Sequence, residues 1–156
     1  MTYTIGHSNH SIDQFIERLV AHRIQVLVDV RSYPKSSYVP HFNRVALKAS
    51  LKLVRIKYTF KGKTLGADGP SVTNQRFKET MGYIRNLSDQ YRVALMCAEL
   101  NPAKCHRASK LTAFLLASGS EVTHITKEGL IEGFELQRVQ KPGWVDPQYR
   151  PKGLFN

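Results

Sequence analysis

Cysteine, acidic residues and long apolar runs are all scarce in this sequence, and each shortage excludes a class of protein. The chain has 156 residues, two cysteines and 42% hydrophobic residues, so it can bury a core without disulfides or metal ions as crosslinks. No window approaches the roughly 18 apolar residues of a membrane-spanning helix. The start, MTYTIGHSNHS, lacks the basic and apolar regions of a signal peptide. We therefore expect a cytoplasmic protein without a membrane partner.

The shortage of acidic residues leaves a strong positive charge that is concentrated in one part of the chain. There are 12 acidic and 23 basic residues, which gives a formal net charge of +11. Between Arg23 and Lys78 the only acids are Asp29 and Asp68, against twelve lysines and arginines. Such a field attracts anionic partners, either small molecules or the phosphates of nucleic acid. A solvated basic face is equally compatible, because the segment contains no recognised nucleic-acid-binding motif.

Apolar segments alternate with amphipathic segments along the chain, and this alternation predicts an α/β fold. We expect a single three-layer domain, residues 1–140, with a mostly parallel sheet flanked by helices. Residues 141–156 contain three prolines and predict an extended tail that Trp144 could dock. The predicted strands are 2–5, 25–30, 55–60, 92–97 and 121–126. Two predicted helices follow the caps Ser11 and Asn43, and the others are 77–87, 105–118 and 130–139. Residues 61–72 are a predicted loop.

Reactive and polar side chains follow three of the predicted strands, at the point where each strand ends. Ligands of open α/β sheets bind just outside the carboxyl ends of the strands, so these side chains are expected to meet in one pocket. The richest group is the run LMCAELNPAKCHRASKL, between the fourth strand and its helix. The expected pocket residues are His7, Asn9, Asp29, Arg31, Asn43, Cys97, Glu99, Cys105, His106 and Arg107.

The two cysteines permit three interpretations. A thiolate nucleophile needs a lowered pKa, which a helix N-terminus, His106 and Arg107 could supply. The same thiols with His106, and with His7 as a further candidate ligand, could bind zinc, although their spacing matches neither a CxxC nor an HxxxH pair. They could also be buried and inert. A disulfide is the least favoured state in a reducing compartment.

Asp29 and Arg31 permit two interpretations. An unpaired carboxylate at the end of an apolar strand is costly, so Asp29 could simply pair with Arg31 or with a backbone turn. Alternatively, Arg31 could clamp an anion while Asp29 orients it.

Five segments resemble the domain-of-unknown-function 488 family. They are TIGHSN at 4–9, LVDVRSYP at 27–34, PHFN at 40–43, the stretch from Tyr58 to Gly66, and LMCAELNPAKCHR at 95–107. The resemblance implies an α/β fold, a small cytosolic protein and a cluster of shared polar residues at one site, but no reaction. The order of the motifs is also similar, more distantly, to rhodanese-like sulfurtransferases, in which Cys97 would match the persulfide-carrying cysteine. The intervening Glu99 and Pro102 depart from that pattern.

The sequence thus favours an enzyme-like domain that acts on an anionic substrate, with a thiol-dependent transferase or hydrolase as the candidate activity. The alternative is a nucleic-acid-binding or accessory module without catalysis, or a zinc site at Cys97, Cys105 and His106. The sequence assigns no cofactor and no resident metal. The predicted catalytic residues are Cys97, Glu99, Cys105, His106, Arg107 and Asp29, and the predicted substrate-binding residues are His7, Asn9, Arg31, Asn43 and Gly66.

Overall fold

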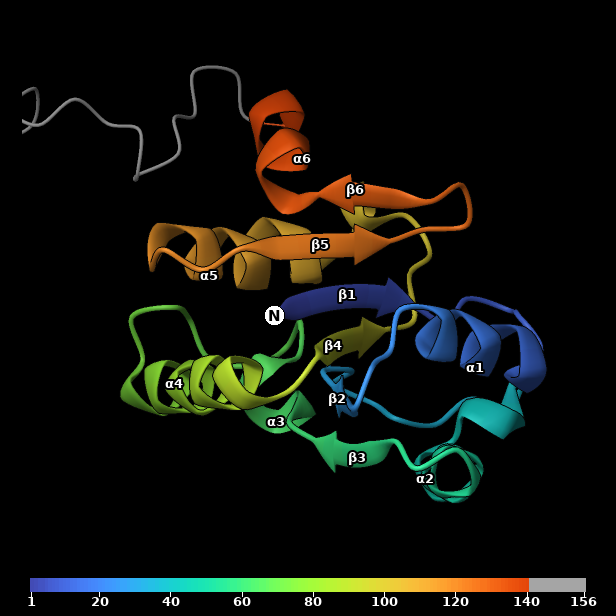
Figure 1. Cartoon of the computed structure of the whole chain (residues 1–156). Coiled ribbons are helices and arrows are strands. Elements are labelled where there is room, and N and C mark those ends of the chain that lie inside the picture. The colour runs from blue at the N-terminus through green and yellow to red at the C-terminus, as the bar shows by residue number, and fades with distance from the viewer. Residues whose placement is uncertain (141–156) are drawn as a thin grey trace, which may run out of the picture.

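The computed structural model describes residues 1–140, with side chains up to residue 136 (Figure 1). The predicted tail, including Trp144, lies outside the described residues. One sheet has the strand order β3-β2-β4-β1-β5-β6, and all neighbours are parallel except β5 and β6. The predicted α/β fold with a mostly parallel sheet is confirmed. The strands are β1 Thr2–Gly6, β2 Val26–Asp29, β3 Lys57–Phe60, β4 Val93–Cys97, β5 Val122–Ile125 and β6 Leu130–Glu132.

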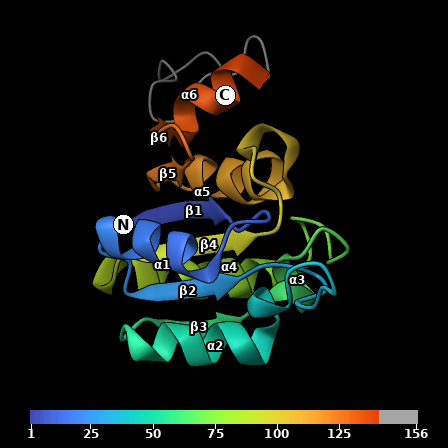
Figure 2. The same ribbon diagram turned by 90° about the vertical axis from the view of Figure 1, so that its right-hand side faces the viewer.

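Helices cover both faces of the sheet (Figure 1, Figure 2). The face that α1 and α2 cover holds a cluster that includes Phe15, Leu47 and Met96, and the opposite face, under α4, holds one that includes Met81 and Leu95. Alternate residues of β4 enter opposite clusters, because successive side chains of a strand point to opposite faces. The helices are α1 Ile12–Ala21, α2 Arg44–Leu53, α3 Gly62–Leu65, α4 Gln75–Gln90, α5 Ala113–Ala117 and α6 Gly133–Gln140.

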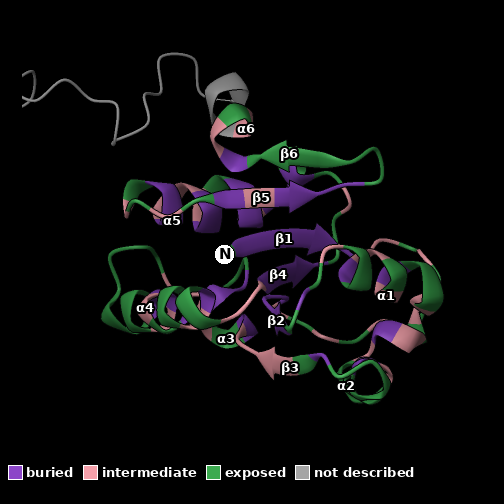
Figure 3. Ribbon diagram, in the orientation of Figure 1, coloured by how far each residue is buried: buried purple, intermediate pink, exposed green. Residues whose placement is uncertain are grey.

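The central strands are buried along their whole length, which explains why they were predictable. Every residue of β1, β2 and β4 is buried, whereas β6 is exposed throughout (Figure 3). The register pairs Gly6 with Cys97 and Asp29 with Met96, so the carboxyl ends of the three strands lie at one edge. Side chains that follow these strands are thereby brought close together.

The two predicted helix caps behave differently. Ser11 caps α1 as expected. Its hydroxyl accepts from Gln14 N–H, and the side-chain oxygen of Gln14 accepts from the Ser11 backbone N–H. Asn43 occupies the cap position of α2 but makes no side-chain capping bond. Its Oδ1 accepts instead from Ser36 N–H at 2.6 Å, which ties down the loop that precedes the helix.

Three predicted segments differ from the structure. The predicted loop 61–72 contains the short helix α3. The predicted helix 130–139 begins with three residues of strand β6, because they pair antiparallel with β5 before the chain turns into α6. The predicted helix 105–118 begins instead as a π-helical segment, Arg107–Thr112, that continues into α5. The Thr112 hydroxyl donates to the Arg107 carbonyl at 2.6 Å within that wider turn.

Candidate active site

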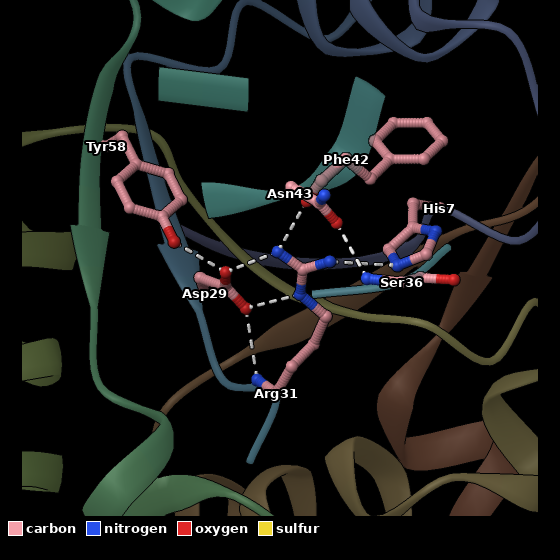
Figure 4. A network of polar contacts seen from close by, with 7 residues as sticks. All are labelled: His7, Asp29, Arg31, Ser36, Phe42, Asn43 and Tyr58. Carbon is pink, nitrogen blue, oxygen red and sulfur yellow. Dashed lines mark hydrogen bonds and ion pairs between the residues drawn. The ribbon is translucent and has the colours of Figure 1, made fainter. Parts of the chain in front are cut away.

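An ion pair between Asp29 and Arg31 lies at the carboxyl end of β2 (Figure 4). Asp29 Oδ1 accepts from Arg31 Nε at 2.9 Å, and Oδ2 accepts from Nη2 at 2.7 Å. Asp29 is completely buried and Arg31 is 6% exposed, so each charge depends on the other. Nη2 also donates to the Phe42 carbonyl, and the Tyr58 hydroxyl donates to Asp29 Oδ2 at 2.6 Å. The structural pairing considered from the sequence is therefore present.

His7 links this ion pair to the end of β1. Its Nδ1 lies 2.7 Å from the Ser8 carbonyl, which can only accept, so Nδ1 carries the proton and Nε2 accepts from Arg31 Nη1 at 3.3 Å. The ring stacks on Phe42 with 4.4 Å between centroids. Burial lowers the pKa of His7 to about 4. His7 is thus neutral near physiological pH and positions the guanidinium.

Two free cysteines lie close together at the carboxyl end of β4. Cys97 is the last residue of β4, and its Sγ lies 2.8 Å from Sγ of Cys105. A disulfide bond is about 2.05 Å long, so a small movement would join the sulfurs. Arg107 Nη1 donates to Cys97 Sγ at 2.7 Å and to the Glu99 carbonyl at 2.5 Å, while Nη2 donates to the Leu100 carbonyl at 2.9 Å. A buried arginine therefore fixes both the thiol and the loop that follows it.

The environment separates the acidities of the two thiols. The hydrogen bond from Cys97 lowers the pKa of Cys105, and bonds to His106 and to the backbone N–H of Arg107 lower it further. The same hydrogen bond, together with burial, raises the pKa of Cys97. Cys105 is also the more exposed of the two cysteines, at 8% against 3% for Cys97. These contacts favour the negative charge on Cys105, with Cys97 as the S–H donor, while the Arg107 guanidinium beside Cys97 acts in the opposite direction.

His106 is oriented to exchange a proton with Cys105. Its Nε2 lies 3.0 Å from the Leu65 carbonyl and must carry a hydrogen in order to donate there. In the neutral ring Nδ1 is then the unprotonated nitrogen, and it lies 3.6 Å from Cys105 Sγ. Nδ1 can therefore take up the proton that the Cys105 thiol loses, and the resulting N–H then donates to the thiolate, which is a contact that also lowers the pKa of Cys105.

A buried polar chain supports Arg107 from behind. Arg107, which is completely buried, donates through Nε to Thr4 Oγ1 at 3.1 Å, and this hydroxyl lies 2.5 Å from His124 Nδ1. Because Thr4 accepts from the arginine, its hydroxyl hydrogen is directed at His124. Among the described residues, His124 Nε2 has no hydrogen-bond partner. Burial, followed by the charge of Arg107, lowers the pKa of His124 to about 4.

His124 is expected to make stability fall in mild acid. Its pKa is about 4 in the folded chain and 6.5 when unperturbed, so between these values the unfolded chain binds the extra proton. Unfolding is then favoured as the pH falls through this window, by up to about 1.4 kcal/mol per pH unit. Urea unfolding of wild type and His124→Gln across this range measures the difference in slope. A variant whose stability falls as steeply as that of wild type would show that His124 is not responsible.

A pocket of about 370 Å³ opens beside the two cysteines. It lies between the loops that follow β2 and β4 and the turn after α3. Its wall brings together five of the predicted site residues, while Arg107 lies behind Cys97. The lining residues are Arg31, Ser32, Tyr33, Ala67, Asp68, Cys97, Ala98, Glu99, Lys104, Cys105 and His106.

The remaining predicted residues lie outside this lining. His7 and Asp29 hold Arg31 from behind, and Asn9 is exposed, where it accepts a long bond from the Ser8 hydroxyl at 3.4 Å. Asn43 holds Ser36. Gly66 ends α3, and a Cβ there would collide with the Ser32 hydroxyl and the Gly62 carbonyl, so glycine permits this turn to approach the pocket wall. The functional roles given to these residues remain predictions.

Glu99 takes part mainly through its backbone. Its carboxylate accepts from Asn101 N–H at 3.0 Å, in the exposed part of the loop, while its carbonyl accepts from Arg107 and lies 3.6 Å from Cys97 Sγ. The loop crosses directly over Gly6, where a Cβ would collide with the same carbonyl. This close approach explains the glycine in the motif at the end of β1.

The geometry gives no support to the zinc alternative. Within residues 1–140, there is no group of three or more His, Cys, Asp or Glu side chains that could hold a metal ion. The other histidine considered as a ligand, His7, is committed to Ser8 and Arg31.

Sequence reasoning missed several contributors. Thr4 and His124 gave a signal, since each is a polar residue within a buried strand. Tyr58 belongs to a quoted motif but was not predicted to bind Asp29. Lys104 and Asp68 lie in irregular segments, and only the folded chain shows that they face the cysteines.

The comparisons with known proteins bear on this arrangement. Residues 11–74 match the family described as Domain of unknown function DUF488. The match confirms the resemblance that the motifs indicated. The DUF488 range contains the Asp29–Arg31 pair and Tyr58, whereas the cysteines follow it along the chain. No curated protein and no solved structure matches the chain. Among the described residues, none of the helices has the length and apolar character needed to cross a bilayer.

Proposed function

We propose that the protein is a thiol-dependent enzyme that reduces disulfides, whose nucleophile is the Cys105 thiolate and whose second thiol is Cys97. The observation that carries the proposal is the 2.8 Å separation of the two sulfurs at the wall of a pocket. Their pairing lowers the pKa of the sulfur that is more exposed, as a nucleophile requires. The distant analogy with sulfurtransferases instead favours Cys97, which is the more deeply buried thiol.

The substrate class we propose is an electrophilic sulfur, carried by a disulfide. The Cys105 thiolate attacks one sulfur of the disulfide, the sulfur–sulfur bond breaks, and one thiolate leaves. Cys97 then loses its proton, to His106 or to solvent, and attacks Cys105 Sγ. This step forms a Cys97–Cys105 disulfide and releases the second thiolate, so the substrate gains two electrons and the protein dithiol loses them. A thiol reductant restores the dithiol.

We further propose that the substrate is anionic and that the reaction takes place in the cytoplasm. The net charge of +11 attracts anions to the whole molecule, while at the pocket wall the exposed ammonium group of Lys104 lies among the carboxylates of Asp68 and Glu99. The carboxylate of Asp29 is neutralised by its pairing with Arg31. A working dithiol needs a reducing compartment, and the cytoplasm is such a compartment.

The test is the stoichiometry of reaction with dithiobis(nitrobenzoate), an anionic aromatic disulfide. Wild type should release two thiolates per chain and end as an internal disulfide. Cys97→Ser should release one and stop at a mixed disulfide on Cys105, because serine cannot displace it. Cys105→Ser should react far more slowly, since Cys97 is the more deeply buried thiol. Absorbance of the released thiolate and the mass of the intact protein give both readings.

Neutral hydroxyethyl disulfide serves as the control for charge. The rate with the anionic reagent should fall with salt, because screening weakens attraction to a cationic protein, whereas the rate with the neutral reagent should not. Equal salt dependence would remove the anionic preference. A Cys97→Ser variant that still releases two thiolates would remove the role of Cys97.

A further inference from the structure

A row of cations runs along α2 at the outer edge of the sheet. Arg44, Lys48 and Lys52 are spaced four residues apart, so they lie on one face of the helix, and all three are exposed. At 1.5 Å per residue the row extends over about 12 Å. The helix sequence RVALKASLKL contains no acidic residue that could neutralise the row. The buried Leu47 and Leu51 anchor the adjoining face.

A second group of cations surrounds a hollow on the other side of β3. This hollow, of about 290 Å³, lies between α3 and α4 and is lined by Lys61, Lys63 and Arg76 together with Phe60 and uncharged residues. Glu79 is the one carboxylate in the lining, and it accepts a hydrogen bond from the Gln75 amide. The hollow therefore has an excess of positive charge.

Phe60, the last residue of β3, joins the two groups. The Arg44 guanidinium lies over its ring, 4.7 Å from the centroid, so the row on α2 reaches the rim of the hollow. On the far side, Lys61 Nζ lies 4.8 Å from the ring centroid of Tyr83, which is 44% exposed. Figure 2 shows α2 and β3 together at the margin of the molecule. We call the surface formed by Arg44, Lys48, Lys52, Lys61, Lys63 and Arg76 the basic edge.

We propose that the basic edge binds single-stranded nucleic acid. Its cations follow a path along one helix and over a strand end into a hollow, and a flexible chain of phosphates can follow such a path. Aromatic rings and guanidinium groups beside the path provide surfaces on which bases stack. A rigid duplex would not bend from the row on α2 into the hollow. A flat anionic bilayer would contact the row but not the recessed cations.

This surface is separate from the cysteine pocket. None of its six residues lines that pocket, whose wall comes from the loops after β2 and β4 and the turn after α3. Nucleic-acid binding and thiol chemistry can therefore be tested independently, and failure of one leaves the other intact.

The test is fluorescence anisotropy with a labelled oligothymidylate of about 16 nucleotides, a length that suits one basic groove. The affinity of wild type should fall steeply with salt, since bound lysines and arginines displace counterions from the strand. Lys48→Glu/Lys52→Glu should bind at least about tenfold more weakly, and its salt dependence should be shallower by about one to two units of logarithmic slope. Both residues are exposed, so the fold should survive, as circular dichroism will show.

A matched control separates local binding from net charge. Arg85→Glu/Lys127→Glu changes the formal charge equally at exposed positions outside the basic edge, and it should bind much closer to wild type. Equal weakening by both double variants would overturn the proposal, as would an absence of binding at low salt. Duplex bound more tightly than the single strand, or binding to vesicles that contain phosphatidylserine without binding to the oligonucleotide, would also overturn it.

Discussion

Iodoacetamide at about pH 7 is expected to modify Cys105 and to leave Cys97 largely unmodified, since an ordinary thiol has a pKa of about 8.5. Cys105 accepts a hydrogen bond from Cys97, contacts His106 and borders the pocket, and all three features favour a reactive thiolate. Its labelling midpoint should lie well below that of a free cysteine. Cys97 is 3% exposed and its pKa is raised, so it should label slowly at any pH that preserves the fold. Mass spectrometry of each cysteine-containing peptide gives the two midpoints.

Two substitutions of Cys97 identify the cause of the reactivity. Serine can still donate a hydrogen bond to the Cys105 thiolate, so Cys97→Ser should keep the low labelling midpoint. Alanine cannot, and a hydrogen bond to a charged group contributes about 1.5–3 kcal/mol, so Cys97→Ala should raise the midpoint by about one to two pH units. Equal midpoints in the two variants would exclude the hydrogen bond as the cause. Slow labelling of both cysteines in wild type would show that the thiols are structural.

Replacement of Asp29 by asparagine is expected to cost about 3–5 kcal/mol of unfolding free energy, because it leaves the Arg31 guanidinium buried without a counter-charge. Asparagine also presents an amide donor where Arg31 and Tyr58 both donate to Asp29. Urea unfolding monitored by circular dichroism measures the loss.

The exposed Asp13 provides the control, since Asp13→Asn removes an equal charge from the first turn of α1. Its loss should be within about 1 kcal/mol. If Asp29→Asn fails to fold, Tyr58→Phe tests the same network by removing one donor to the carboxylate. A loss in Asp29→Asn as small as that in Asp13→Asn would show that the ion pair does not stabilise the fold.

The sequence could predict those parts of the fold that depend on local pattern. Continuous apolar runs revealed β2 and β4, and the polar residues that end them, Arg31 and Cys97, line the same pocket. The strand β6 escaped prediction because three exposed residues carry no period and are ordered only by pairing with β5. The helix α3 was missed because the glycines around it indicated a loop.

The parts of the site that were not predictable depend on contacts between distant segments. The hydrogen-bonded side chains of Arg107, Thr4 and His124 come from residues up to 120 positions apart in the sequence, and no local pattern encodes these contacts. Glu99 looked like a catalytic acid from its position, yet its carboxylate bonds to its own loop while its carbonyl supports Arg107. Residue type therefore indicated which segments meet at the strand ends, but only the folded backbone shows which atoms make the contacts there.

The two outermost strands also affect how copies of this chain meet. β3 has four residues, starts at the exposed Lys57 and is followed by Lys61, while the opposite margin is the three-residue β6. An unpaired strand can template the addition of another chain, and short length and lysine side chains both oppose this. Within the described residues, neither margin offers a long apolar strand. The β3 margin is thus protected from edge-to-edge aggregation by its lysines, and the β6 margin by its short length.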